Sequence, residues 1–562
     1  MSAPSEASAA SAAPPDWHQI DWARLHGTVR RLQARIVKAT QAGDWRRVKA
    51  LQRFLTRSFA GKAVAVKRVT ENQGKNTPGV DRQVWSNPET KRQAIETLGR
   101  RGYRPLPLRR VYIPKANGTM RPLGIPTLRD RAQQALHLLA LAPVAETLAD
   151  RNSYGFRPER ATADAICQCH TVLSGHDKAQ WVLEGDIKGC FDHISHDWLV
   201  ANVCMDQAIL RKWLKAGYVE SGRLFPTTAG TPQGGIISPT LANCTLDGLE
   251  AALEARFGSK GNRKAGKNKV NLVRYADDFI ITGSSKELLE GEVKPLVEAF
   301  LTTRGLELSQ EKTRITHVAE GFDFLGQRVR KFGTAIIITP SKKNVQAFKA
   351  KVKSIFAAQK SAQQENLIAQ LNPVIRGWAN YHRAVSASQT FAAIDAWLWR
   401  KTWQWAKRRH PNKSAGWTKS KYFGTIGQRN WVFVSRTSDS EGRRKSVALA
   451  KASDTKIRRH TKIKGEANPF DPQWETYFED RLGLKMQGSL TGRRKLLYLW
   501  WSQNKRCVLC DEPITTETGW HVHHRIPRDQ GGSDAYANLA LLHPNCHRQL
   551  HANGWKLEAG SL

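Results

Sequence analysis

The chain has 562 residues, with 88 Lys and Arg against 49 Asp and Glu, for a formal net charge of +39. This length accommodates several domains. So strong a positive field implies a polyanionic partner, because the cations repel one another until phosphates neutralise them. Since 40% of the residues are apolar, the charge belongs to folded domains rather than to a basic tail. We predict a folded nucleic-acid-binding protein with no membrane partner, since no run of about 18 apolar residues occurs.

Residues 1–15 are rich in Ala, Ser and Pro and lack a basic start followed by an apolar core. We expect a disordered leader here rather than a signal peptide. Apolar residues at helical spacing between positions 17 and 60 predict two helices, with Asp44 as the N-cap of the second. A strand over 111–113 and an apolar helix over 128–148 follow.

Residues 181–340 alternate strand-like and helical segments, which predicts an α/β domain. Asp186 ends an apolar strand, and Asp277 and Asp278 lie between two apolar runs. Side chains alternate along a strand, so this pair must lie at a hairpin tip to converge on one centre. Such carboxylates suit two Mg2+ ions for nucleotidyl transfer, with the carbonyl of Ile187 as a further ligand. A solvated turn is the alternative interpretation of the Asp-Asp pair.

A glycine-containing loop, Gln233-Gly234-Gly235, lies between these carboxylates in the sequence. Paired glycines let the backbone approach a nucleotide or template closely. Ser238 and Pro239 then predict the start of a helix, with the serine as cap and the proline at the first position. The Lys-, Gly- and Asn-rich insert at 258–269 is either a solvated loop or a contact to an RNA backbone.

The segment 342–410 is predicted to be helical and contains a tryptophan-rich run, of which we expect Trp397, Trp399 and Trp403 to be core residues. Residues 400–464 combine many cations with interspersed aromatic residues, a composition that favours backbone tracking and base stacking.

Two cysteine-containing pairs near the C-terminus each have two intervening residues: Cys507 with Cys510, and His543 with Cys546. Each pair has the turn length that places two ligands on one ion, so the sequence predicts a tetrahedral structural Zn2+ site. Incidental thiols are the alternative. This arrangement indicates a reducing compartment rather than a disulfide framework.

The motifs around Asp186, Gln233-Gly234-Gly235 and Tyr275-Ala276-Asp277-Asp278 resemble, in order and spacing, palm motifs A, B and C of reverse transcriptases. Further segments are similar to those of group II intron-encoded proteins: Asn76–Asp81, Arg121–Pro126, Ser153–Pro158, Glu311–Thr313, Phe324–Gly326 and the maturase, or X, domain at 342–440.

The resemblance implies a multidomain α/β fold: a right-hand polymerase with fingers, palm and helical thumb, plus a C-terminal ββα-metal HNH domain with zinc knuckles. The boundaries that we predict are 16–180 for the N-terminal extension and fingers, 181–340 for the palm, 341–440 for the thumb or X domain, 441–490 for a basic DNA-binding region and 491–562 for the nuclease.

The resemblance also implies roles for residues around the palm. Phe191 matches the aromatic steric gate, whose ring excludes a 2′-hydroxyl and so selects dNTPs; a core aromatic is the alternative. The implied nucleotide- and primer-binding residues are Lys115, Arg121, Arg129, Gln233, Gly234, Phe324 and Gly326.

The C-terminal spacing resembles that of HNH endonucleases. His547 and His551 are four residues apart on a predicted helix, so they share one face and can bind one divalent metal with His523. His521 is a competitor for the third ligand position. The resemblance makes His524 the general base that activates water, and Asn538 the residue that braces its loop.

Taken together, the resemblance implies a reverse transcriptase and maturase that binds group II intron RNA, assists its splicing, nicks target DNA and extends the nicked strand with dNTPs. Two alternatives stay open: a non-mobile host or defence reverse transcriptase with a nuclease domain, and a splicing-only RNA-binding maturase. The expected compartment is the bacterial cytoplasm, with an organellar matrix as the alternative. The sequence carries no signal for an oligomeric state.

Overall fold

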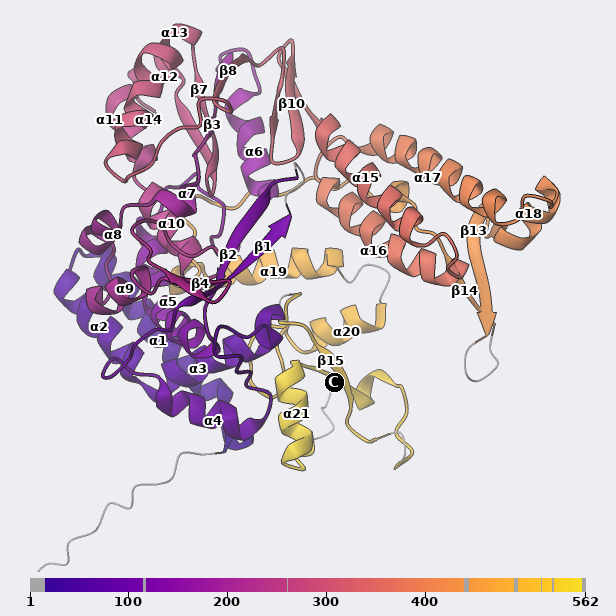
Figure 1. Cartoon of the computed structure of the whole chain (residues 1–562), viewed down its shortest axis with the longest axis horizontal. Helices are drawn as coiled ribbons and strands as arrows, with labels where there is room; N and C mark the ends of the chain where they lie inside the picture. Colours follow the sequence, from indigo (N-terminus) through magenta and orange to yellow (C-terminus); the bar gives the residue numbers. More distant parts are fainter. Residues whose placement is uncertain are drawn as a thin grey trace, which may run out of the picture.

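The computed structural model describes residues 16–114, 118–259, 261–438, 444–489, 494–516, 518–527 and 530–557. The predicted leader at 1–15 and Lys115 lie outside these ranges. The thumb projects away from the palm, whereas the C-terminal module lies beside the N-terminal helices (Figure 1). Within the ranges described, no helix has the length and apolar character needed to cross a membrane.

The N-terminal region is a bundle of helices built around one buried helix, α5 (Leu128–Leu148). The helices that surround it are α1 (Trp22–Gln41), α2 (Trp45–Arg57), α3 (Phe59–Glu71) and, against α3, α4 (Pro88–Thr97). Asp44 caps α2 as predicted, because its side chain accepts a hydrogen bond from the backbone N–H of Arg47 at 2.9 Å. The predicted helix over 128–148 is α5.

The fingers contain a four-stranded sheet in the order β2-β1-β4-β5. Its strands are β1 (Leu108–Pro114), β2 (Met120–Ile125), β4 (Tyr218–Glu220) and β5 (Arg223–Phe225). β1 includes the strand predicted at 111–113 and pairs antiparallel with β2 but parallel with β4.

The palm sheet has the order β6-β7-β3-β8, and every pairing in it is antiparallel. Its strands are β3 (Trp181–Asp186), β6 (Asn271–Tyr275), β7 (Asp278–Gly283) and β8 (Arg314–His317). Val182, Val273 and Ile280 pack with α6 (Thr162–Leu173) on one face. The alternate residues pack on the other face with α10 (Ser238–Leu246), α11 (Leu249–Phe257) and α14 (Lys294–Thr302).

Helix α10 begins differently from the prediction for Ser238. Ile237 is the N-cap and Ser238 is the first helical residue, whose hydroxyl makes no capping bond. The reason lies in a distant side chain: Gln134 Oε1 accepts a hydrogen bond from the backbone N–H of Ile236 at 2.8 Å and turns the chain before the serine. Proline still occupies the first turn of the helix.

The thumb consists of helices followed by a small sheet. The helices are α15 (Lys342–Ala358), α16 (Gln364–His382), α17 (Ser388–Arg409) and α18 (Ala415–Tyr422), and the strands are β12 (Phe423–Ile426), β13 (Arg429–Ser438) and β14 (Arg444–Ala448). Trp397 and Trp403 pack against the core. The prediction for Trp399 is wrong: its side chain is 40% exposed, because it lies on an outer face of α17, stacked on Trp403 and touching Trp431.

Residues 449–471 form a strap that returns from the thumb across the palm. Asp164 of α6 accepts hydrogen bonds from His460 Nε2 and from the backbone N–H of Ile463, each at 2.8 Å. Arg160 donates to the carbonyl oxygen of Ala467 at 2.9 Å. Much of the region predicted to contact DNA is therefore bonded to the palm, while the strap leaves these cations exposed: Lys451, Lys456, Arg458, Arg459 and Lys464.

The C-terminal module joins helices to an antiparallel hairpin. Its elements are α19 (Glu475–Ser489), α20 (Arg494–Ser502), β15 (His521–His524), β16 (Leu539–Leu542) and α21 (Pro544–Ala552). The strands β15 and β16 with α21 form the predicted ββα unit.

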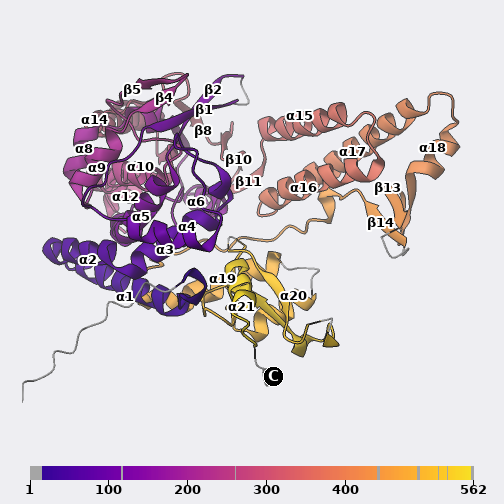
Figure 2. The ribbon, with the colours of Figure 1, turned by 60° about the horizontal axis from the view of Figure 1, so that its bottom comes forward.

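This module shares a core with the start of the chain. Trp17 and Ile20 belong to the same buried apolar cluster as Leu541 and Leu550. The Gln549 Nε2 amide donates to the carbonyl oxygens of His18 and Ile20 at 2.9 and 2.8 Å. Figure 2 shows α21 and α19 beside α1. Residues 17–20 and the elements β16 and α21 therefore belong to one packed unit.

Candidate active sites

Three carboxylates meet at one end of the palm sheet. Asp186, at the end of β3, is in register with Asp278, at the start of β7. The turn between β6 and β7 contains only Ala276 and Asp277, and Ala276 adopts a left-handed φ of 59°. The tight hairpin thus brings both adjacent aspartates to the strand end, as its sequence required.

The carboxylates repel one another. Desolvation, followed by repulsion from Asp277 and Asp186, raises the pKa of Asp278 to about 6. Desolvation and the charge of Asp186 also raise the pKa of Asp277, and the positive charges of Arg121 and Lys312 offset part of that rise. A group of carboxylates whose negative charge is only partly offset fits divalent cations such as Mg2+.

Lys312 is a site residue to which the sequence assigned no individual role. Its Nζ lies 2.7 Å from Asp186 Oδ2, across the end of the palm sheet. Lys312 precedes β8, which pairs with β3. Only that pairing brings the ammonium to the carboxylates. The sequence had indicated the segment Glu311–Thr313 by its resemblance to the family, but not this contact.

Gly155 fixes the aspartate hairpin from behind. A Cβ atom on Gly155 would lie 2.3 Å from the backbone nitrogen of Ala276, so only glycine allows this approach. The neighbouring Tyr154 donates its backbone N–H to the Arg274 carbonyl at 2.9 Å. The buried Arg274 guanidinium in turn pairs with Asp247. These contacts hold the hairpin tip rigidly against the segment Ser153–Pro158.

The glycine loop joins the fingers to the palm. A Cβ on Gly234 would lie 2.3 Å from the carbonyl oxygen of Gly124 in β2, so the two backbones touch. At the other end of the loop, Thr231 donates its N–H to the carbonyl oxygen of Phe191 at 2.7 Å. Gln233 and Gly234 therefore lie between the fingers sheet and the residue predicted to be the steric gate.

Phe191 is half-buried and makes an edge-to-face contact with Phe156, with ring centroids 6.1 Å apart. Phe156 is 51% exposed. It belongs to Ser153–Pro158, but the sequence assigned it no role. The two rings thus contact each other next to Gly155, which packs against the aspartate hairpin.

Replacing Phe191 with Ala is expected to reduce discrimination against ribonucleotides at least about tenfold, the usual effect of removing a close apolar contact. The ratio of kcat/KM for a dNTP to that for the matching rNTP measures the effect. Phe332→Ala, which removes an exposed ring, is the control. Unchanged sugar selectivity in Phe191→Ala would assign Phe191 to the core instead.

The predicted fingers cations occupy different environments. Arg121 in β2 contributes positive charge at Asp277. Arg129 donates to the carbonyl oxygen of Thr97 at 3.4 Å, and its guanidinium lies over the Tyr103 ring at 5.8 Å. Arg121 thus faces the carboxylates, whereas Arg129 is engaged within the fingers.

Phe324 and Gly326 lie in a hairpin that the thumb supports. β9 (Phe322–Phe324) and β10 (Gln327–Phe332) pair with each other, and β10 pairs with β11 (Ala335–Pro340). The Tyr381 hydroxyl of α16 donates to the carbonyl oxygen of Leu325 at 2.7 Å, a contact that the sequence did not indicate. The predicted primer-binding turn is thus bonded to the thumb.

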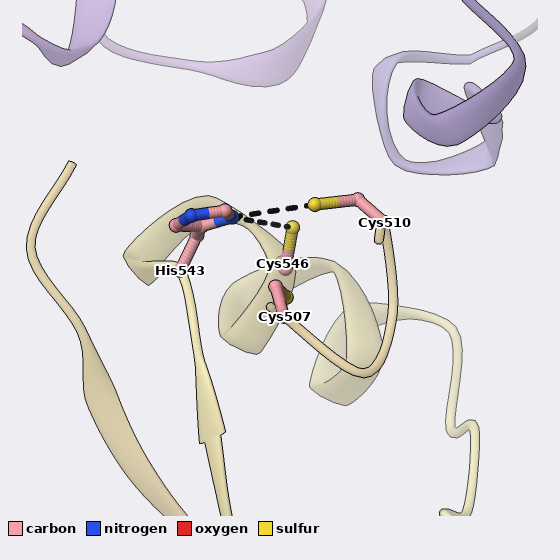
Figure 3. A group of neighbouring side chains, drawn as sticks. All are labelled: Cys507, Cys510, His543 and Cys546. Atoms are coloured by element: carbon pink, nitrogen blue, oxygen red, sulfur yellow. Dashed lines mark hydrogen bonds between the residues drawn. The ribbon is translucent and has the colours of Figure 1, made fainter. Parts of the chain in front are cut away.

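Cys507, Cys510, His543 and Cys546 converge in the C-terminal module (Figure 3). Their ligand atoms lie within 4.8 Å of one another, and all four residues are buried. His543 Nδ1 faces the sulfurs of Cys510 and Cys546 at 3.3 and 3.9 Å. Its Nε2 lies 3.2 Å from the carbonyl oxygen of Pro513, which orients the ring. Three thiols and one imidazole in this arrangement fit tetrahedral Zn2+.

A second cluster consists of imidazoles: His523, His547 and His551 offer ligand atoms within 4.8 Å of one another. Burial, followed by repulsion from the neighbouring histidines, lowers the pKa of His547 to about 4, and burial lowers that of His523. Both rings are therefore neutral at pH 7, the state that binds metal. The competitor His521 lies 3.4 Å from His547, Nδ1 to Nδ1, but is exposed and outside this cluster.

His524 ends strand β15 next to this cluster. Its Nε2 lies 2.8 Å from Asp534 Oδ1, and the sequence had assigned no role to Asp534. Asn538 Oδ1 accepts from the N–H of Ile526 at 2.8 Å, and its Nδ2 donates to the carbonyl oxygen of Ser533 at 2.7 Å. Asn538 thus ties together both ends of the loop that follows His524, the position that a bracing residue requires.

Four family models match the chain in order. They are the N-terminal domain of reverse transcriptase at residues 17–98, reverse transcriptase (RNA-dependent DNA polymerase) at 113–329, the group II intron maturase-specific domain at 345–423 and HNH endonuclease at 507–553. These matches confirm the predicted multidomain α/β class, with a reverse transcriptase domain followed by a C-terminal HNH domain.

Several curated proteins are similar to the chain. Protein YkfC of Escherichia coli (strain K12) is 36% identical over 322 residues, which cover 50% of this chain and 83% of YkfC. Group II intron-encoded protein LtrA of Lactococcus lactis subsp. cremoris is 34% identical over 339 residues, or 48% of this chain and 55% of LtrA.

A 91 kDa protein in the cob intron of Schizosaccharomyces pombe is 25% identical over a match of 581 residues. The match covers 87% of this chain and 68% of that protein. The chain therefore spans about half the length of LtrA. By its ordered domains and these relatives, the chain belongs to the group II intron-encoded proteins that carry reverse transcriptase, maturase and HNH endonuclease domains.

Proposed function

We propose that this protein binds group II intron RNA, assists its splicing, nicks target DNA and copies the RNA into DNA from the nicked strand. One observation carries the proposal: the same chain holds a carboxylate cluster in its palm and a separate imidazole cluster in its C-terminal module. A nick creates a 3′-hydroxyl, which is the substrate that a polymerase extends. The two sites therefore suit consecutive steps of one process.

In the polymerase, Asp186, Asp277 and Asp278 would hold two Mg2+ ions, with the Ile187 carbonyl as a further ligand. When bound, such ions activate the 3′-hydroxyl and stabilise the leaving pyrophosphate. Phe191 would border the sugar of the incoming dNTP. The nucleotide would contact Gln233, Gly234 and the cations Lys115, Arg121 and Arg129, and the primer would contact Phe324 and Gly326.

In the nuclease, His524 would take the proton of the attacking water, while Asn538 keeps its loop in place. A divalent metal held by His523, His547 and His551 would offset charge on the scissile phosphate. The Cys507, Cys510, His543 and Cys546 cluster would hold structural Zn2+ and take no part in the reaction.

RNA and DNA binding would rely mainly on phosphate contacts, so we expect affinity to fall steeply with salt. On the thumb, Lys419 lies 4.5 Å from the ring centroid of Trp431 beside the exposed Trp399. Such a surface suits stacked bases next to a backbone. The exposed cations of the strap supply a second basic face, for target DNA.

Relatives from Escherichia coli and Lactococcus lactis support the bacterial cytoplasm as the compartment, with an organellar matrix as the alternative. An intron flanking the coding sequence would exclude a non-mobile host or defence enzyme. The complete carboxylate set at Asp186, Asp277 and Asp278 favours an active polymerase over a splicing-only maturase.

One assay tests the coupled activities. It measures nicking and extension when the wild-type protein is given intron RNA, dNTPs and either an intact or a pre-nicked target duplex. His524→Ala is expected to remove nicking, and therefore extension, on the intact duplex, while it extends the pre-nicked duplex normally. The loss of nicking should reach about 100-fold or more, the usual contribution of a general base.

Extension of intact duplex by His524→Ala at the wild-type rate would overturn the proposed coupling. A wild-type protein that extends neither substrate would contradict the polymerase assignment. A chain that promotes splicing but neither nicks nor polymerises would support the splicing-only alternative.

A further inference from the structure

We infer that Asp534 is a positioning residue for His524: its carboxylate holds the Nε2 hydrogen of the imidazole and leaves Nδ1 as the proton acceptor. The inference rests on the proposed nuclease function and deepens it, because it assigns the reacting atom of the general base.

The hydrogen-bonding geometry determines the tautomer. His524 Nε2 lies 2.8 Å from Asp534 Oδ1. An ionised carboxylate only accepts hydrogen bonds, so the imidazole nitrogen facing it must carry the hydrogen. A neutral imidazole has one such nitrogen, and the other then presents its lone pair. Asp534 therefore directs the basic lone pair of His524 to Nδ1. A carboxylate that orients a catalytic histidine plays the same part in Ser-His-Asp enzymes.

Asp534 is itself held in place. The Lys495 ammonium donates to the main-chain carbonyl of Asp534, and Asn538 Nδ2 donates to the carbonyl oxygen of the preceding Ser533 at 2.7 Å. A Cβ on Gly532 would lie 1.8 Å from the carbonyl oxygen of Ile526, so the loop closes on itself at a point where only glycine fits. Three independent contacts thus fix the backbone of the loop that carries Asp534.

Part of this support comes from outside the matched nuclease segment. Lys495 belongs to α20, whereas the HNH match covers residues 507–553. Tyr498, one helical turn further, packs on Tyr536 with ring centroids 4.6 Å apart. Helix α20 therefore contacts the loop at two points, the main-chain carbonyl of Asp534 and the ring of Tyr536. Deletion of α20 is expected to impair the nuclease even though every residue of the HNH match remains.

Asp534 is separate from the imidazole cluster. The residues whose ligand atoms converge there are His523, His547 and His551. Oδ1 of Asp534 instead faces Nε2 of His524, the ring nitrogen other than the proposed proton acceptor Nδ1. Loss of the carboxylate should therefore slow the proton transfer while leaving metal and DNA binding intact.

The test uses the full-length chain with Asp534→Ala, Asp534→Glu and the control Asp480→Asn, which neutralises an exposed acid on α19. Single-turnover nicking at saturating DNA and Mg2+ is expected to slow about 10–100-fold in Asp534→Ala, as typical for a residue that orients a site histidine. KM for DNA and extension of pre-nicked DNA should stay at wild-type values. Asp534→Glu should recover part of the rate, and histidine 15N shifts should show mixed tautomers only in Asp534→Ala.

Each outcome has a distinct meaning. If His524→Ala is inactive but Asp534→Ala nicks at the wild-type rate, the positioning role is overturned and the proposed nuclease stands. A changed KM or metal affinity with an unchanged rate also overturns it, because Asp534 would then act on DNA or metal. If His524→Ala itself nicks normally, the proposed nuclease centre fails.

Discussion

Replacing Asp277 with Asn is expected to reduce DNA synthesis on an RNA template by about 1000-fold or more. The hairpin tip would lose one of the three carboxylates that hold the cations, whose charge stabilisation is worth several kcal/mol of the barrier. Incorporation of a single dNTP on an RNA template, followed over time, measures the effect. Asp197→Asn, which neutralises an exposed acid of the same domain, should polymerise normally.

Stability should change in the opposite direction to activity. Desolvation and Asp186 raise the pKa of Asp277 above its usual value, so the ionised carboxylate costs folding free energy at neutral pH. The cost is present above the folded pKa and disappears as the pH falls below the unfolded one. Metal-free Asp277→Asn should therefore unfold at the wild-type temperature or higher. Retained polymerisation would contradict the palm assignment, whereas a lowered unfolding temperature would contradict the electrostatic cost assigned to Asp277.

Removing zinc, by chelation or by Cys507→Ser, is expected to unfold the C-terminal module. Structural zinc contributes about 10–16 kcal/mol of binding free energy in small zinc domains, and three of its four ligands here belong to the buried cluster of this module. Nicking should be lost. Hydrogen exchange should rise in α20 and α21, and also at Trp17 and Ile20, whose burial depends on the module.

The matched control is Cys204→Ser, because Cys204 is a half-buried thiol outside the metal cluster. Metal analysis of the purified chain should find one zinc per molecule in wild type and none in Cys507→Ser. If hydrogen exchange at Trp17 and Ile20 in Cys507→Ser equals that of the wild type, the packing of these residues on the C-terminal module does not depend on the zinc centre. Absence of zinc from the wild-type chain would refute the metal assignment.

Local patterns predicted the elements that local forces determine. Asp44 caps its helix because the capping bond spans three residues, and α5 follows a continuous apolar run. The aspartate hairpin was predictable because two adjacent carboxylates between strands can converge only at a turn. Spacing indicated the two zinc-ligand pairs and the His547–His551 pair, since the two members of each pair lie about one turn apart, whereas the choice of His523 over His521 needed the folded strand.

Contacts between distant segments were not predictable in this way. Gly155 fits against Ala276, Lys312 reaches Asp186, and Tyr381 supports Leu325 only after the palm and thumb have assembled. Distant contacts also account for both errors. Gln134 binds the N–H of Ile236 just before α10, where Ser238 is already helical, and Trp399 contacts Trp431 of β13 but keeps 40% of its surface exposed.

The shared core of the two chain ends has a consequence for synthesis on the ribosome. Leu541 and Leu550, which complete the apolar cluster of Trp17 and Ile20, are made more than 500 residues after them. At roughly 5–20 residues per second, this delay is on the order of 25–100 s. During that interval Trp17 and Ile20 lack the side chains of β16 and α21 that cover them, so this part of a nascent chain exposes apolar surface until both elements have been made.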